Sequence, residues 1–95
     1  MAPTLQSQID ARKAIIQPLK EELIKRLDLP YTPEDIHEDV SLLGAGLGLD
    51  SLDALEIVMA IEGRFSVKVP DGNPAILRSL NTIVDFIEEE LEAAK

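Results

Sequence analysis

The sequence has no cysteine and no tryptophan, and its 95 residues include only three aromatic side chains, Tyr31, Phe65 and Phe86. Without cysteine the chain has no disulfide, no thiol nucleophile and no thiolate metal ligand. A single histidine, His37, also excludes a histidine-rich metal centre, so no metal site is expected. With so few aromatic residues, the core must be built from aliphatic side chains.

Basic residues are also scarce, because nine Lys and Arg face eighteen Asp and Glu, for a formal net charge of −9. A surface of this charge repels nucleic acid and anionic membranes, so the expected partners are basic proteins. The longest apolar run in the helical stretches, Ile57 to Ile61, is far shorter than the roughly 18 residues of a membrane span. Met1 to Asp10 lacks a basic start and an apolar stretch, so we expect no signal peptide and a cytoplasmic location.

The length allows one domain over residues 1–95, and the spacing of its apolar residues predicts helices. The first helix carries an apolar stripe interrupted by Arg12, and the continuity of this stripe favours one helix through Pro18. Residues 1–15 are expected to form an N-terminal extension of that helix. The stripe consists of Leu5, Ile9, Ile16, Leu19, Leu23 and Leu27.

A long loop rich in proline and glycine is expected from Asp28 to Asp50, followed by a second helix over Ser51 to Phe65. Asp50 is its expected N-cap, and Asp53 lies near the positive end of the helix dipole. The expected core-facing arc is Ala54, Leu55, Ile57, Val58, Ile61 and Phe65. The expected outer face is Leu52, Asp53, Glu56, Met59, Ala60 and Gly63.

A short helical turn is expected from Asn73 and Pro74 to Arg78, and a last helix follows a cap at Ser79 or Asn81. The apolar positions of that helix are Leu80, Ile83, Val84, Ile87 and Leu91. The fold class is therefore all-α, with three main helices and one short helix.

Acidic residues gather between residues 34 and 62, a segment without Lys or Arg, and an exposed serine, Ser51, begins a helix within it. The hydroxyl of Ser51 would project where free backbone N–H groups and the helix dipole favour an anion such as a phosphate ester. The alternative is that Ser51 only caps the helix.

The segment "GLGLDSLDALEIVMAIEGRF" at residues 46–65 resembles the region around the prosthetic-group serine of acyl carrier proteins. The resemblance extends from Ile16 to Leu91 and includes "VPD" at Val69 to Asp71 and "IVDFI" in the last helix. It implies the acyl-carrier-like four-helix bundle. It also implies that a phosphopantetheinyl transferase attaches 4′-phosphopantetheine from coenzyme A to Ser51. The chain would then be a monomeric phosphoprotein that carries acyl groups as thioesters and is not itself an enzyme.

The same resemblance implies a face that binds acyl-transferring and condensing enzymes with basic docking surfaces: Asp50, Leu52, Asp53, Glu56, Met59 and Glu62. It further implies an acyl-chain cleft lined by Val58, Ile61, Leu77, Leu80 and Ile83. Gly63 and Arg64 stand where carriers of fatty acid synthesis usually have acids, and the loop before Ser51 is one residue longer. The pathway is therefore either fatty acid synthesis or a specialised, polyketide-like lipid pathway.

Two other functional classes remain open on the sequence. "LDSL" is similar to a motif of serine hydrolases, but the only histidine that could act as a base is His37, in the acidic loop. An acidic helical interaction module without covalent modification would use the exposed Leu52 and Met59 equally well. Gly44, Gly46 and Gly48 lack the third glycine and the βαβ context of a dinucleotide site and indicate a loop.

Overall fold

The computed structural model describes residues 4–43, 46, 48–70 and 75–93. Three α-helices, α1 (Leu5–Leu27), α2 (Ser51–Phe65) and α3 (Leu80–Ala93), are joined by a short 3-10 helix, η1 (Pro33–Asp35), and by irregular segments. Leu43 and Leu49 form an isolated β-bridge, and no strand occurs among the described residues. The expected all-α class is confirmed.

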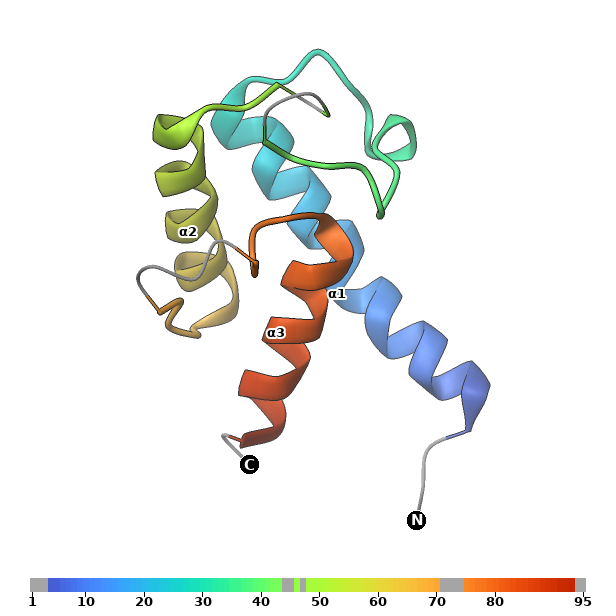
Figure 1. The fold of residues 1–95 in the computed structure, drawn as a ribbon. Helices are drawn as coiled ribbons and strands as arrows, with labels where there is room; N and C mark the ends of the chain where they lie inside the picture. The colour runs from blue at the N-terminus through green and yellow to red at the C-terminus, as the bar shows by residue number, and fades with distance from the viewer. Residues whose placement is uncertain (1–3, 44–45, 47, 71–74, 94–95) are drawn as a thin grey trace.

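The helix α1 is the centre of the bundle, because it packs against both α2 and α3. In Figure 1 it passes behind the upper part of α3 and ends beside the first turn of α2, and the long connection from α1 to α2 covers one end of the bundle. The core is almost entirely aliphatic, as expected from the composition. Its fully buried large side chains are Leu19, Leu42, Ile57, Ile61, Leu80, Ile83, Val84 and Ile87.

The helix α1 runs without a break through Pro18, as the apolar stripe predicts. The hydroxyl of Thr4 caps it by accepting a hydrogen bond from the Ser7 backbone N–H at 3.1 Å. The helix ends at Asp28, which adopts the left-handed conformation with φ 52° and donates its backbone N–H to Ile24.

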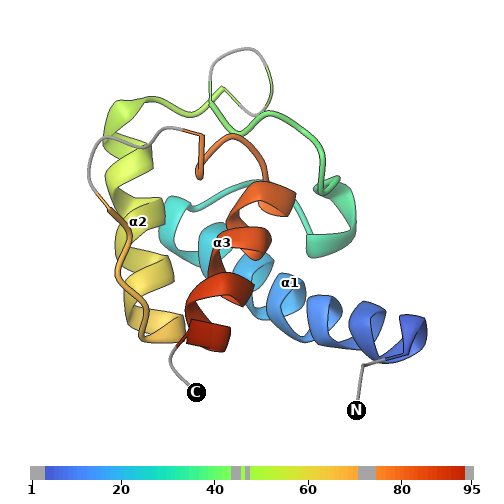
Figure 2. The same cartoon turned by 60° about the horizontal axis from the view of Figure 1, so that its bottom comes forward.

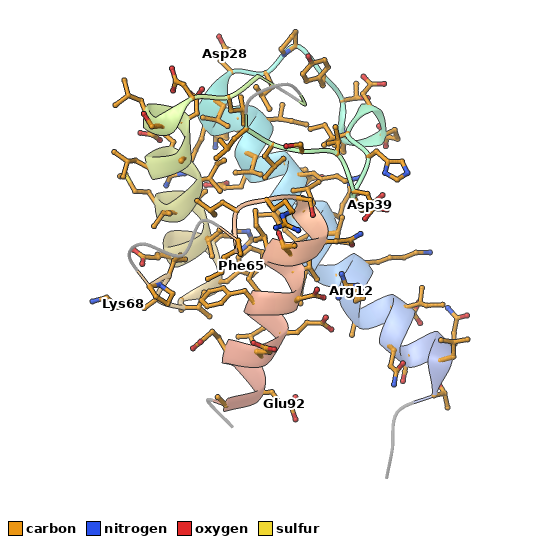
Figure 3. The ribbon with its side chains drawn as sticks, in the orientation of Figure 1. Arg12, Asp28, Asp39, Phe65, Lys68 and Glu92 are labelled. Atoms are coloured by element: carbon orange, nitrogen blue, oxygen red, sulfur yellow. The ribbon has the colours of Figure 1, made fainter. Side chains whose placement is uncertain are left out.

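The N-terminal turns of α1 extend past α2 and α3 in both views of the ribbon (Figures 1 and 2). Leu5 and Ile9, expected in the buried stripe, are therefore 74% and 38% exposed. The polar residue in the stripe, Arg12, explains how the helix is held where it meets α3 (Figure 3). Its guanidinium pairs with Asp85 at 2.7 Å and Glu88 at 2.6 Å on α3.

The helix α2 is rotated relative to the expected orientation. Leu55, expected in the core, is 61% exposed, and Ala60, expected outside, is fully buried. At about 100° per residue, Leu55 lies about 160° around the helix axis from Ile57, the centre of the buried face. The expected core-facing arc therefore wrongly includes Leu55 on one side and wrongly omits Ala60 on the other.

The loop between α1 and α2 is fixed to the bundle by its apolar residues and by hydrogen bonds to the start of α3. Ile36 and Leu42 are buried, and the Leu42 backbone N–H donates to the Arg78 carbonyl at 3.0 Å. The Asn81 backbone N–H donates to the Glu38 carbonyl, and its side-chain amide donates to Asp39. The loop is thus held in a defined path against the start of α3.

A buried cation supports the same loop from α1. Lys20, only 7% exposed, places its Nζ 3.1 Å from Glu38 Oε1. The pKa of Glu38 is lowered by a hydrogen bond from its own backbone N–H and by Lys20. Because the pKa of Glu38 is lower in the folded state, its ionised carboxylate stabilises the fold at neutral pH. This contribution is lost as the pH falls through the folded pKa.

The segment before α3 contains the expected short helical turn only in part. Asn73 and Pro74, its expected start, lie outside the described residues, and the Arg78 backbone N–H donates to the Ala75 carbonyl in a turn. Ser79 is the cap of α3, one of the two expected candidates. Its hydroxyl accepts from the Thr82 backbone N–H, and the Thr82 hydroxyl accepts from the Ser79 backbone N–H.

Candidate functional site

Ser51 is the first residue of α2 and is exposed. Its hydroxyl makes no hydrogen bond to any described part of the chain. A serine that only served the fold would use this oxygen for a cap or a turn. The Ser51 Oγ is therefore accessible from solvent and is chemically available.

The helix cap is Asp50, as the sequence predicts. One carboxylate oxygen of Asp50 accepts hydrogen bonds from the backbone N–H groups of Leu52 and Asp53, each at 3.0 Å. Asp53 returns the contact, because its Oδ2 accepts from the Asp50 backbone N–H at 3.0 Å. This reciprocal capping box fixes the start of α2. It excludes the alternative in which Ser51 itself is the cap.

The capping box also weakens the expectation that free backbone N–H groups at the start of α2 bind an anion. Two N–H groups of the first turn, those of Leu52 and Asp53, are occupied by the Asp50 carboxylate and are not free to bind a phosphate. A phosphate ester on Ser51 would therefore extend into solvent beside Asp50.

A substitution at Asp50 separates its capping role from its charge. We expect Asp50→Ala to lower the free energy of unfolding by about 1 kcal/mol, whereas Asp50→Asn retains a capping oxygen and stays near the wild-type value. Urea unfolding of the three proteins measures this difference. An Asp50→Ala protein as stable as wild type would contradict the capping role.

An apolar strip runs down α2 from Ser51 on the side away from the core. It consists of Leu52, Leu55 and Met59, which are 71%, 61% and 53% exposed. Leu52 and Met59 are the apolar members of the expected partner face, whereas Leu55 was missed. Its position on the helical wheel, almost opposite Ile57, is the signal that would have identified it.

The two remaining acids of the expected partner face have partners within the molecule. Glu56 Oε2 lies 3.5 Å from Arg26 Nη1 on α1. Glu62 Oε2 accepts a hydrogen bond from the Val69 backbone N–H at 2.9 Å and so holds the segment after α2. The acidic residues of this face thus also have structural roles: Asp50 and Asp53 cap α2, Glu56 pairs with α1, and Glu62 anchors the segment after α2.

The loop that leads to Ser51 passes close to its own backbone and needs glycine at two positions. A methyl group at Gly46 would lie 1.7 Å from the Ser41 carbonyl oxygen, so no other residue fits there without movement of the loop. Gly48 has φ 76°, a left-handed conformation that glycine adopts without strain. The next residue, Leu49, is buried and holds the loop immediately before the cap.

Four of the five residues expected to line an acyl-chain cleft lie in the core, and Val58 is half-buried. Ile61, Leu80 and Ile83 are fully buried, and Leu77 is 8% exposed. Their packed side chains form part of the aliphatic core. An acyl chain entering here would have to displace contacts between these side chains.

His37, the only candidate base for a serine hydrolase, lies in the loop and not beside Ser51. Its Nδ1 accepts a hydrogen bond from the Asp39 backbone N–H at 3.2 Å. Figure 3 shows Asp39 on the opposite side of the loop from the start of α2. The structure therefore brings together Ser51 and the residues of the expected partner face but does not bring His37 to the serine.

Two further properties concern metal and membrane binding. Within residues 4–43, 46, 48–70 and 75–93, no group of three or more His, Asp or Glu side chains is arranged to hold a metal ion. Across the same ranges, no helix combines the length and the apolar character that a membrane span requires.

Comparison with known proteins agrees with this geometry. A family profile described as a phosphopantetheine attachment site matches residues 17–88. The acyl carrier protein of Sulfurovum sp. (strain NBC37-1) is 32% identical over 75 residues, which cover 79% of this chain and 96% of that protein. The acyl carrier protein of Wolinella succinogenes is 33% identical over 75 residues, covering 79% and 95%. The mitochondrial acyl carrier protein of Neurospora crassa is 35% identical over 72 residues, covering 76% and 53%.

Proposed function

Because this chain belongs to the phosphopantetheine-binding acyl carrier protein family, we propose that Ser51 is its attachment site for 4′-phosphopantetheine. The observation that carries the proposal is the exposed Ser51 hydroxyl, which has no hydrogen-bond partner in the described chain and follows the Asp50 cap directly. The open surroundings of this oxygen fit a flexible phosphodiester arm. The protein is a carrier and not an enzyme.

When bound, the group supplies a terminal thiol that holds acyl chains as thioesters. The chain's own residues present that arm and recognise the enzymes that act on it. The capping box of Asp50 and Asp53 holds Ser51 at a rigid helix end, where the hydroxyl is within reach of a transferase. Rigid presentation on a helix lowers the entropy that each partner must remove on docking.

The proposed partner face combines the apolar strip with the acids beside it. Its expected partners are a phosphopantetheinyl transferase and acyl-transferring and condensing enzymes with basic docking surfaces, which bind the carrier as a monomer. Complementary charge speeds association, and a small face allows rapid release after each step. The face comprises Asp50, Leu52, Asp53, Glu56, Met59 and Glu62, to which the exposure of Leu55 adds a seventh residue.

An acyl chain is proposed to enter between α2 and α3, among Val58, Ile61, Leu77, Leu80 and Ile83. The support is chemical, because four of these five side chains lie in the aliphatic core and offer an apolar environment to a hydrocarbon chain. Entry requires these packed side chains to separate.

The acyl groups are proposed to belong to fatty acid synthesis or to a specialised, polyketide-like lipid pathway. Gly63 and Arg64 on α2 reduce the negative charge of its last turns and support the specialised alternative. The proposal includes a cytoplasmic location. Because some relatives are named mitochondrial, fractionation of the source cells, with detection by an antibody against this chain, tests the proposed location.

Intact mass spectrometry tests the carrier function. The purified apo chain is incubated with coenzyme A and a broad-specificity phosphopantetheinyl transferase, and the expected result is the addition of one phosphopantetheine mass. Peptide mapping then locates the modified residue. An unmodified chain, under conditions in which a known carrier is fully loaded, would favour the alternative of an interaction module without a covalent group.

A further inference from the structure

Arg26, in the last turn of α1, lies between acidic residues of two helices. Its Nε donates to Glu22 Oε1 at 3.3 Å on its own helix, and its Nη1 lies 3.5 Å from Glu56 Oε2 on α2. The three side chains are 32%, 28% and 45% exposed, so the cluster is at the surface. Arg26 therefore places a positive charge against the face that surrounds Ser51.

The position of Gly63 extends this contact along α2. A methyl group at Gly63 would lie 3.9 Å from Arg26 Nη2, which is an ordinary van der Waals distance. Glu56 and Gly63 are seven residues apart and share one edge of the helix. Because Gly63 has no side chain, nothing at that position competes with Glu56 for the guanidinium.

The two edges of the apolar strip consequently differ in charge. On one edge Glu56 is paired with Arg26. On the other edge Glu62 contacts a backbone N–H, and no ion pair of Glu62 occurs within the described part of the chain. A partner that places a cation against Glu56 must displace Arg26, whereas a cation placed against Glu62 meets no such competitor.

We propose that Arg26 is a specificity-determining residue that masks Glu56 and so selects against partners that recognise that edge of α2 with a cation. This inference rests on the proposed carrier function. The favoured partner has an apolar pocket for Leu52, Leu55 and Met59 and carries its basic groups on the Glu62 side. An Arg26 that only stabilised the contact of α1 with α2 would leave docking rates unchanged.

A double-mutant cycle tests the masking at low and at physiological salt. The probe is kcat/KM of a broad-specificity phosphopantetheinyl transferase, because an enzyme that accepts many carriers is not restricted to the Glu62 edge of α2. The proteins are wild type, Arg26→Gln, Glu56→Gln and the double variant. Lys25→Gln is the matched control, because it removes the same charge from the neighbouring exposed position, which makes no ion pair within residues 4–43, 46, 48–70 and 75–93. Thermal unfolding confirms that each variant is folded.

We expect Arg26→Gln to raise kcat/KM by about two- to fivefold at low salt, the range of an exposed ion pair, and by less at physiological salt. Lys25→Gln should change the rate less, and in the Glu56→Gln background Arg26→Gln should have only the effect of Lys25→Gln. Equal effects of Arg26→Gln and Lys25→Gln, or an Arg26 effect that persists without Glu56, would overturn the proposal.

A second experiment measures how strongly a small cation binds at Glu56, using proteins that lack the prosthetic group. Tetralysine is titrated into each apo protein, and the backbone amide signals of α2 are followed by NMR. Arg26→Gln should lower the tetralysine concentration at which the signals of residues 56–63 shift, and unchanged titrations would contradict the masking. If the transferase never loads the wild-type chain, the carrier function is contradicted. The tetralysine titration does not depend on loading, so it still tests the role of Arg26.

Discussion

A Ser51→Ala variant is expected to fold like the wild type and to gain no phosphopantetheine when incubated with coenzyme A and a transferase. The loss should be complete, because alanine has no oxygen with which to form the phosphodiester. Folding should be preserved because the Ser51 hydroxyl makes no hydrogen bond to a described residue, and Asp50 provides the cap. Intact mass and far-UV circular dichroism measure the two properties on one sample.

Ser7→Ala is the control for this experiment, because Ser7 is exposed on α1 and is remote in sequence from the site. It should be loaded as completely as the wild type. If Ser51→Ala still gains the group, the attachment site lies elsewhere in the chain. If the wild type and Ser7→Ala remain unmodified while a known carrier is loaded, the carrier function itself is wrong.

Ile61→Ala is expected to lower the free energy of unfolding by about 2–5 kcal/mol, because it removes methyl and methylene groups from a fully buried position. This is a large part of the roughly 5–15 kcal/mol that stabilises a small domain. If the proposed acyl cleft includes Ile61, an octanoyl chain on the arm fills part of the cavity. Octanoylation should therefore raise the melting temperature of Ile61→Ala more than that of the wild type.

Leu19→Ala provides the matched control, since Leu19 is equally buried but belongs to α1 and not to the proposed cleft. It should lose comparable stability and recover less on octanoylation. Ile61→Val, with an expected loss of about 0.5–1.5 kcal/mol, keeps the test usable if the alanine variant does not fold. Equal recovery by the Ile61 and Leu19 variants would place the acyl chain outside the cleft.

The acids around Ser51 have structural roles in addition to their charge, which affects how substitutions on this face are interpreted. Asp50 and Asp53 hold the helix start, and Glu62 holds the segment after the helix through Val69. Their replacement by alanine therefore perturbs the fold as well as docking. Replacement by the corresponding amide removes the charge and keeps one acceptor oxygen, which is enough for the single oxygen that each of these contacts uses.

The start of α2 could be predicted in detail because its determinants are local. An aspartate before an apolar-periodic segment, with a second aspartate three residues later, is sufficient to form the capping box of Asp50 and Asp53. The end of the helix at Phe65 follows from the same apolar periodicity. The position of Ser51 as the first helical residue was therefore available from the sequence.

The orientation of α2 was less accessible because it depends on what packs against the helix. Periodicity shows that an apolar face exists, but the limits of the buried arc are set by the neighbouring helices. Ala60, about 60° around the helix axis from Ile57, lies within the arc that these neighbours bury. Leu55, almost opposite Ile57, was placed in the core although the helical wheel alone puts it outside. In α1, likewise, Leu5 and Ile9 follow the stripe but extend beyond the helices that would cover them.

Four features follow from the sequence alone: the all-helical class, the aliphatic core, the continuity of α1 through Pro18 and the placement of Ser51 after its cap. Each depends on composition or on interactions among residues close in the chain. Three contacts depend on how the helices pack in space: Arg12 holds α1 against α3, Glu62 anchors Val69, and Arg26 pairs with Glu56. The Arg12 and Arg26 contacts join different helices, and that of Glu62 follows the turn of the chain after α2. Their partners are set by how the elements pack, which local spacing does not specify.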